Sequence, residues 1–353
     1  MNIIDLARPN IVKLQPYSSA RSENSSGILL DANENSIGSV VENYPVDDLN
    51  RYPDPNQKAV RIKLGEYLNL PYENLYCGVG SDEIIDLLIR IFCEPGRDNA
   101  IIVEPTYGMY KVACDINDAA VKSVNLSDDF QIDIAKTLSS ADANSKLMFL
   151  CSPNNPTGNL LNKEDILSLV RGFNGIVAVD EAYIEFNEKG SVINEVLNYP
   201  NLVVLRTFSK AWGLAGARCG YLAADESVIS LIFKIKAPYN LNRLTSGIII
   251  EALDKKEKKE IFVSMINLEK ERIIEKMASL KGIEKIFTSD ANFILFRCSN
   301  SDNVYKYLLE KGIVIRDRSS HPMLKGCLRM SVGTRHENDL FLTALWRALC
   351  EIS

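Results

Sequence analysis

One lysine of this sequence stands where a charged side chain is unexpected. Lys210 follows the apolar run LVVL at 202–205 in the segment LVVLRTFSK, and Arg218 comes soon after it in GLAGARCG. An amine that is shielded from water and close to other cations stays partly neutral, and the neutral amine is both a nucleophile and a base. Glycines allow a backbone to approach a bound group closely. The segment is therefore a candidate for a reactive amine beside an anion-binding turn.

Three further apolar runs also end in polar side chains. Tyr107 follows IIVEP, Asn155 lies in LCSPNNPTG, and Asp180 and Tyr183 lie in IVAVDEAY. Taken singly, each has an ordinary structural explanation: NNPTG suits a turn, Asp180 could cap a helix, and Tyr107 could pack against a core. Their recurrence at the ends of successive runs is what needs explaining.

The runs that precede these side chains alternate with amphipathic helices from about residue 76 to 224. Three helical stretches repeat apolar residues at the spacing i, i+3, i+4, i+7. The middle one uses Met109, Val112, Ala113 and Ile116. Strands that are apolar throughout and alternate with such helices predict an α/β fold with a mostly parallel central sheet covered on both faces. Ligands of such sheets bind at the carboxyl ends of the strands, so we expect the polar side chains to converge on one crevice.

The pattern changes after Leu241. A long helical stretch carries the charge run DKKEKKE at 254–260, which is most simply a solvated helix face. The later segments ANFILFRC, IVIRDR and CLRMSVG, with a helix among them, predict a smaller α/β unit. A chain of 353 residues also exceeds the usual size of a single core. We therefore predict a large domain over 35–245 and a smaller one formed by 1–34 and 246–353.

Charge and composition favour some classes of protein over others. The net charge of -6 gives no electrostatic attraction to nucleic acid or to an anionic membrane. No basic and then apolar leader begins the sequence, and no run of about 18 apolar residues occurs, so a cytoplasmic protein is expected. The eight cysteines are scattered without a CxxC pair, and His321 and His336 lie near no Cys/His cluster. Reduced thiols and no metal site are predicted.

Taken jointly and in this order, these residues resemble the active site of the fold-type I pyridoxal-phosphate aminotransferases. The resemblance extends over nearly the full chain. The resemblance implies that Lys210 binds the cofactor covalently and later moves a proton, and that Asp180 pairs with the pyridine nitrogen. Asn155 and Tyr183 would hydrogen-bond the phenolic oxygen of the cofactor. The resemblance also implies that Lys210, Asp180 and Tyr183 are the catalytic residues. Tyr107 would stack on the ring, and the phosphate would be bound by Gly80, Ser81, Asp82, Thr207, Ser209 and Arg218.

Motifs along the chain narrow the resemblance to the histidinol-phosphate aminotransferase family; they include LQPY, LLDANEN, NRYPDP, CGVGSDE, VIRDR and CLRMSVGT. The resemblance implies exchange of an amino group between L-histidinol phosphate and 2-oxoglutarate in histidine biosynthesis, in two half-reactions at one site. It also implies a homodimer in which Tyr52 reaches the other subunit's active site. The substrate residues implied are Tyr17, Asn33, Tyr52, Asn155, Arg316 and Arg329. An arginine suits phosphate and carboxylate alike, so which anion Arg316 and Arg329 each hold stays open.

Several alternatives remain. Aromatic aminotransferases and threonine-phosphate decarboxylase use the same cofactor cradle, so residue identity separates them poorly. A non-catalytic regulatory protein on this fold is a further class, and a spectral response to glutamate would distinguish a catalyst from it. A nicotinamide dehydrogenase is disfavoured because no G-x-G-x-x-G spacing occurs, and no GxxxxGK[ST] phosphate loop is present.

Overall fold

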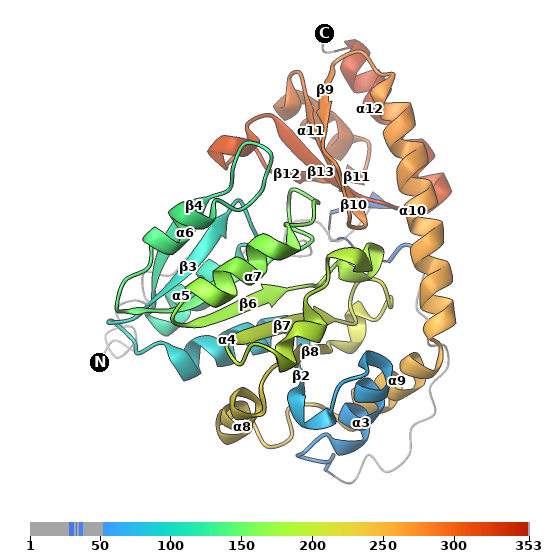
Figure 1. The fold of residues 1–353 in the computed structure, drawn as a ribbon. Helices are drawn as coiled ribbons and strands as arrows, with labels where there is room; N and C mark the ends of the chain where they lie inside the picture. The colour runs from blue at the N-terminus through green and yellow to red at the C-terminus, as the bar shows by residue number, and fades with distance from the viewer. Residues whose placement is uncertain (1–27, 32, 34, 38–51, 352–353) are drawn as a thin grey trace, which may run out of the picture.

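The computed structural model describes residues 28–31, 33, 35–37 and 52–351, and Figure 1 shows how they are arranged. Tyr17, one of the residues expected to bind substrate, lies outside these ranges. Within the described residues the strands form one large sheet, one smaller sheet and a two-stranded ribbon.

The large sheet has seven strands in the order β2-β8-β7-β6-β5-β3-β4. Neighbouring strands are parallel except at β8, which runs antiparallel to both β2 and β7. This confirms the mostly parallel sheet. The strands are β2 (Leu75–Gly78), β3 (Asn99–Glu104), β4 (Ala120–Asn125), β5 (Ser145–Cys151), β6 (Ile176–Asp180), β7 (Leu202–Thr207) and β8 (Gly220–Ala223).

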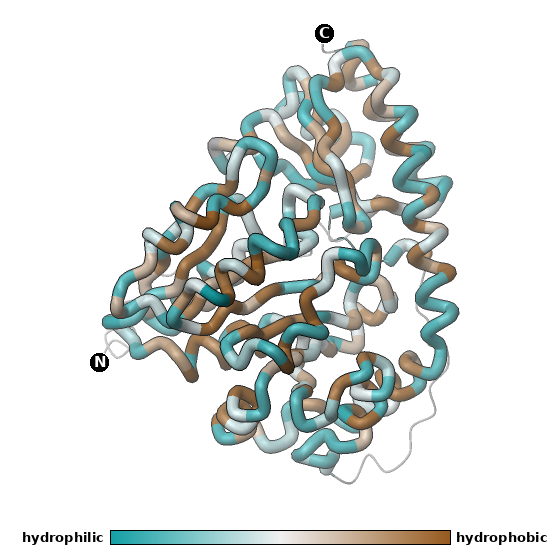
Figure 2. The backbone as a smooth tube through the Cα atoms, viewed as in Figure 1, coloured by the Kyte–Doolittle hydropathy of each residue, from teal (hydrophilic) through white to brown (hydrophobic). Residues whose placement is uncertain are grey.

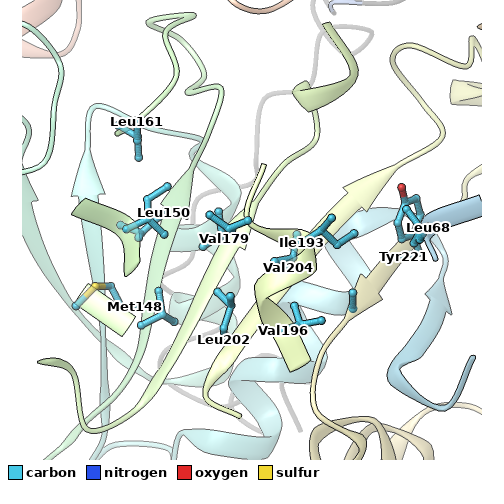
Figure 3. Close-up of a cluster of buried hydrophobic side chains, with 14 of the residues drawn as sticks. Leu68, Met148, Leu150, Leu161, Val179, Ile193, Val196, Leu202, Val204 and Tyr221 are labelled. Carbon is cyan, nitrogen blue, oxygen red and sulfur yellow. The ribbon is translucent and has the colours of Figure 1, made fainter. Parts of the chain in front are cut away.

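Both faces of this sheet are buried, because successive residues of a strand point to opposite faces and enter different cores. In β7, Val204 joins one hydrophobic cluster and Leu205 the other. Figure 3 shows Leu150, Val179 and Val204 packed across three neighbouring strands on the first face. The central strands accordingly appear as hydrophobic segments in Figure 2. The covering helices are α3 (Lys58–Leu68), α4 (Gly80–Phe92), α5 (Met109–Asn117), α6 (Ile134–Ser139), α7 (Lys163–Gly172), α8 (Glu226–Ile235) and α9 (Arg243–Asp254).

The smaller sheet is antiparallel, in the order β12-β13-β10-β9, and β1 pairs in parallel with β11 beside it. Helix α10 (Lys256–Ala278) runs alongside the structure from α9 up to the smaller sheet (Figure 1). The domain limits of 35–245 and 246–353 stay a prediction. The elements are β1 (Ile28–Leu29), β9 (Ile283–Ile286), β10 (Phe293–Cys298), β11 (Ile313–Val314), β12 (Arg316–Asp317), β13 (Cys327–Ser331), α11 (Ser301–Glu310) and α12 (Arg335–Glu351).

Short 3₁₀ helices complete the fold: η2 (Tyr72–Asn74), η3 (Ile184–Phe186), η4 (Glu188–Gly190), η5 (Ile193–Leu197), η6 (Ala215–Ala217) and η7 (Pro322–Leu324). All eight cysteines are free thiols and only Cys350 is exposed, as predicted for packing residues. Among the helices of the described ranges, none is long and apolar enough to cross a membrane.

The charge run at the start of α10 is not simply a solvated face, and that expectation was wrong for Lys259. Its side chain is buried, with Nζ 3.4 Å from the hydroxyl of Tyr67 and 3.5 Å from a carboxylate oxygen of Glu188. The reason is tertiary: α10 packs against η3, which follows β6 in the large sheet. A run of like residues along a helix cannot reveal which one of them faces a neighbouring element.

Candidate active site

A cavity of about 220 Å³ lies at the carboxyl ends of the strands of the large sheet. β6 and β7 end at it with Asp180 and Thr207, and the turn after β5 contributes Asn155. The structure brings all eleven residues expected to bind the cofactor into its wall, while their roles toward that cofactor stay predictions. The lining residues are Gly80, Ser81, Asp82, Tyr107, Cys151, Asn155, Asp180, Ala182, Tyr183, Thr207, Ser209, Lys210, Ala215 and Arg218.

Asp180 is a buried carboxylate that is fixed by two hydrogen bonds. Its Oδ1 accepts from the backbone N–H of Ala182 at 3.0 Å, and its Oδ2 accepts from the hydroxyl of Tyr110 at 2.7 Å. Burial disfavours the charged form and raises the pKa of Asp180 to about 6, although both hydrogen bonds act to lower it. The side chain is thus held in one orientation and titrates near neutral pH.

Tyr110 is a site residue that the sequence reasoning missed. It lies on α5, where the expected apolar face of Met109, Val112, Ala113 and Ile116 is only partly right: Ala113 is buried, Ile116 is exposed, and Tyr110 is fully buried although it was not expected there. The ring of Tyr110 stacks on Phe149 with centroids 4.9 Å apart, which directs its hydroxyl toward Asp180. A pattern that counts only aliphatic residues overlooks a tyrosine that packs its ring and points its hydroxyl inward.

Lys210 follows β7 and shares the cavity with Asp180. Its Nζ lies 5.6 Å from the ring centroid of Tyr183. The Tyr183 hydroxyl accepts from Asn33 Nδ2 at 3.0 Å and from Asn155 Nδ2 at 3.4 Å. Burial raises the pKa of Tyr183 to about 12, and the nearby charge of Arg329 opposes that rise. Tyr183 is therefore a neutral phenol that stays available for hydrogen bonding beside the lysine.

The opposite end of the cavity is built to receive an anion. Helix α4 begins there at Gly80, whose own N–H donates to the carbonyl oxygen of Arg218 at 3.1 Å, so the next residues of its first turn, Ser81 and Asp82, supply the N–H groups that have no partner within the helix. Gly80 has a φ of +75°, and a Cβ on it would lie 2.7 Å from a guanidinium nitrogen of Arg218. A Cβ on Gly220 would lie 2.5 Å from the backbone nitrogen of Ser81. These glycines are needed because β8, α4 and Arg218 approach so closely.

Hydroxyl and cationic groups complete this end. Thr207 Oγ1 bonds Ser209 Oγ at 3.0 Å, and Arg218 Nη2 lies 3.7 Å from a carboxylate oxygen of Asp82. The other oxygen of Asp82 accepts from the hydroxyl of Tyr107 at 3.1 Å. The Asp82 carboxylate thus contacts both the Tyr107 hydroxyl and the Arg218 guanidinium, while the backbone of Asp82 belongs to the first turn of α4.

Of the residues expected to bind substrate, Asn155 lines the cavity, and the structure joins Arg329 and Asn33 to it. Buried Arg329, on β13, donates to Asn155 Oδ1 through Nη1 and to the carbonyl oxygen of Asp31 at 2.9 Å through Nη2. Asn33 bonds Tyr183 and also accepts from the hydroxyl of Ser331 at 2.9 Å. Asn33, Asn155, Tyr183 and Arg329 therefore form one connected network.

Arg316 and Tyr52 are placed differently. Arg316 on β12 stands directly opposite Arg329 in the antiparallel register, so both side chains project from the same face of the smaller sheet. Tyr52 is 78% exposed, and its ring stacks on Tyr239 with centroids 4.5 Å apart. It does not line the cavity of its own chain.

The fold and this site define a class I and II aminotransferase. The chain matches the family model "Aminotransferase class I and II" over residues 25–345, and it belongs to that family. It is 44% identical to the histidinol-phosphate aminotransferase of Bacteroides fragilis over 97% of both chains, and 43% identical to that of Flavobacterium johnsoniae over 98% of this chain and 99% of the relative. The crystal structure of histidinol-phosphate aminotransferase from Sinorhizobium meliloti in complex with pyridoxal 5'-phosphate has the same fold, with a TM-score of 0.87 at 23% identity and 98% coverage of both chains.

Enzymes of this family depend on pyridoxal 5'-phosphate, and the cavity fits that group. The glycine cradle, the first turn of α4 and Arg218 supply donors for a phosphate dianion. At the other end, a buried carboxylate suits a protonated ring nitrogen, and a lysine suits an aldehyde.

Proposed function

We propose that this protein transfers the amino group of L-histidinol phosphate to 2-oxoglutarate, giving imidazole acetol phosphate and glutamate in histidine biosynthesis. The observation that carries the proposal is a second set of cations beside the cavity. Arg329 and Arg316 stand opposite each other on β13 and β12, and Arg329 is bonded to Asn155 in the cavity wall. A cofactor phosphate and a substrate anion then have separate sites. The names of the relatives at 43–44% identity support the choice of substrate.

Each residue of the cavity then has a role toward the cofactor. When bound, pyridoxal 5'-phosphate supplies an electron sink for the bond that breaks at the substrate carbon. Asp180 holds the ring nitrogen, Asn155 and Tyr183 hold the phenolic oxygen, and Tyr107 stacks on the ring. The phosphate is held by the backbone of Gly80, Ser81 and Asp82 and by the side chains of Thr207, Ser209 and Arg218.

Lys210 is the proton carrier in this proposal. Its amine would hold the cofactor, and the same amine would carry a proton from the substrate carbon to the cofactor. A tethered base stays within reach of that proton, which favours transfer. The same side chain returns a proton in the second half-reaction, when glutamate or its keto acid occupies the site.

The substrate anions bind at the smaller sheet in this proposal. Arg329 and Arg316 take the phosphate of one substrate and a carboxylate of the other, and Asn33 and Tyr17 are the further substrate-binding residues. Tyr52 acts from the partner subunit of a homodimer, and the enzyme is cytoplasmic. Because an arginine fork fits both anions, one pocket serves both half-reactions.

A comparison of substrates tests the proposal directly. The purified enzyme with cofactor is given histidinol phosphate, phenylalanine, tyrosine or threonine phosphate, each with 2-oxoglutarate, while glutamate formation and CO₂ release are measured. We expect the highest kcat/KM for histidinol phosphate and no CO₂ from threonine phosphate. A higher kcat/KM for the aromatic donors would favour an aromatic aminotransferase, and CO₂ release would favour the decarboxylase.

A further inference from the structure

The loop between β9 and β10 connects the smaller sheet to the segments that follow β5 and β6 of the large one, and Asp290 makes three of the hydrogen bonds in this connection. The N–H of Asp290 donates to the carbonyl oxygen of Gly158 at 2.7 Å. Its Oδ2 accepts from the N–H of Leu160 at 2.9 Å, and its Oδ1 accepts from Asn187 Nδ2 at 2.8 Å. One side chain thus binds two segments that lie 130 and 103 residues away in sequence.

Close backbone packing surrounds this contact. Gly158 has a φ of +88°, and a Cβ on it would lie 3.0 Å from Ser289 Oγ, so a side chain there would press on the loop. Ser289 Oγ bonds the carbonyl oxygen of Phe293 at 2.5 Å, which ties the loop to the first residue of β10. The contact is therefore continuous from the turn at Gly158 into the smaller sheet.

The turn that Asp290 holds is the one that carries Asn155. It is braced internally, because Asn154 N–H donates to the Asn159 carbonyl at 2.8 Å and Gly158 N–H donates to the Asn154 carbonyl at 2.7 Å. Arg329, which lies opposite Leu295 of β10, donates to Asn155 Oδ1. The smaller sheet and its loop thus contact the turn that carries Asn155 at two points, through Asp290 and through Arg329.

We propose that Asp290 is a positioning residue that fixes Arg329 relative to Asn155. The role in substrate binding rests on the function proposed above. Asp290 holds the turn of Asn155 from the loop that leads into β10, and β10 pairs with β13, which carries Arg329.

The test is Asp290→Asn in the enzyme with its cofactor. An amide keeps the size of the side chain but turns one acceptor into a donor, which opposes either Leu160 N–H or Asn187 Nδ2. We expect the KM for both substrates to rise about tenfold, which is the effect of losing one hydrogen bond to a charged group. Both kcat and the affinity for the cofactor should stay within about threefold, because the hydrogen-bond partners of Asp290, which are Gly158, Leu160 and Asn187, do not line the cavity.

A second readout needs no turnover. Hydrogen exchange at the Leu160 amide reports its bond to Asp290 in the enzyme without substrate, and we expect it to accelerate at least about tenfold in Asp290→Asn. Asp133→Asn is the matched control, since Asp133 accepts from Lys136 N–H at the start of α6, where asparagine caps equally well. It should change neither KM nor exchange at Leu160.

Asn187→Ala is the milder variant if Asp290→Asn folds poorly. It removes one donor and leaves the bond to Leu160, so KM should rise less, and the two substitutions combined should add less than their separate effects. Unchanged KM values in Asp290→Asn with faster Leu160 exchange would refute the proposal, as would a loss of cofactor affinity that accompanies the rise in KM. An enzyme that transfers no amino group from histidinol phosphate would refute the proposed function instead, because the exchange readout is independent of substrate.

Discussion

At the scale of single residues, neighbouring groups fix the orientation of the charged side chains in the site and shift their pKa values. Asp180 ends a buried strand and is held by Tyr110 and by a backbone N–H. The residues of the cavity wall were predictable because polar side chains that end parallel strands must meet at one edge. Tyr110 was not, since its contact with Asp180 depends on the rotation of α5 about its axis, which the apolar spacing misjudged.

Lys210→Ala should abolish amino transfer, with kcat at least about 10⁴-fold lower, because no other side chain is tethered at the reacting carbon. Stability should change little, since Lys210 lines a cavity and is not part of a hydrophobic cluster. Single-turnover reaction with glutamate and thermal unfolding measure the two effects. Lys210→Arg is the control that keeps the charge without a nucleophilic amine, and substantial turnover by either variant would contradict the assigned role.

Tyr110→Phe tests the support of Asp180. The hydroxyl of Tyr110 favours the ionised carboxylate, so its removal should raise the pKa of Asp180 above the present value of about 6. The ionised form is the one that holds a protonated ring nitrogen. The acid limb of kcat/KM should therefore move to higher pH by about one unit, while activity at alkaline pH is kept. A pH profile that keeps its acid limb would show that Tyr110 does not tune Asp180.

At the scale of elements, strand register and helix packing determine where charged side chains lie. The register of β12 and β13 sets Arg316 opposite Arg329, and the packing of α10 on η3 buries Lys259 near Glu185. The strands themselves were predictable from their apolar runs. The register of β12 and β13 was not predictable, and neither was the burial of Lys259 within its charge run, because both depend on contacts between distant parts of the chain.

Arg329→Ala should impair both half-reactions. The substitution removes a buried cation and leaves Asn155 Oδ1 and the Asp31 carbonyl without this donor. We expect kcat/KM to fall about 100-fold for glutamate and for histidinol phosphate alike, and about tenfold for Arg316→Ala, whose side chain is only partly buried. Steady-state rates with each substrate give the comparison. An unchanged response to glutamate in Arg329→Ala would exclude a shared anion pocket.

Glu185 on η3 predicts a pH effect on stability. Its carboxylate is buried, and neither oxygen has a hydrogen-bond partner within the described part of the chain. Burial raises the pKa of Glu185 from 4.5 to about 7, against the opposing charges of Arg206 and Lys259. Because the folded state binds the proton more tightly, ionisation destabilises the fold as pH rises from about 4.5 to 7.

Glu185→Gln removes this titration. Relative to the parent, the variant should gain free energy of unfolding between pH 5 and pH 8, by about 3 kcal/mol at most. Denaturant unfolding of both proteins at the two pH values measures the difference. Glu310→Gln is the control, because Glu310 is exposed at the end of α11. A parent and variant with parallel pH dependence would contradict the prediction.

At the scale of the whole molecule, the kind of sheet was predictable from the sequence, whereas the assembly of subunits stays a prediction. Alternating apolar runs and helices predict one mostly parallel sheet covered on both faces, which the structure confirms; the order of the strands and the antiparallel direction of β8 were not predicted. Tyr52, by contrast, lies on the surface of its own chain against Tyr239. A residue that acts in another subunit leaves no contact in its own site, so only the assembled protein can reveal its role.

Mixing inactive subunits tests the proposed homodimer. If Tyr52 serves the neighbouring site, a dimer of one Lys210→Ala subunit and one Tyr52→Ala subunit has one intact site. Random exchange of equal amounts should then restore about a quarter of the parent activity. Each variant alone and a mixture of two differently tagged Lys210→Ala preparations are the controls. Activity equal to the average of the separate variants would place Tyr52 outside the shared site.

Arg329 already has two acceptors inside the chain, Asn155 Oδ1 and the Asp31 carbonyl oxygen. If Arg329 binds the substrate anions as proposed, an arriving anion exchanges with one of these partners, and its net affinity is the difference between two similar hydrogen bonds. When the product leaves, the acceptor within the chain takes its place at the Arg329 guanidinium. A catalyst that must hold a phosphate and a dicarboxylate in turn profits from such an exchange, because neither anion is retained so tightly that it blocks the next one.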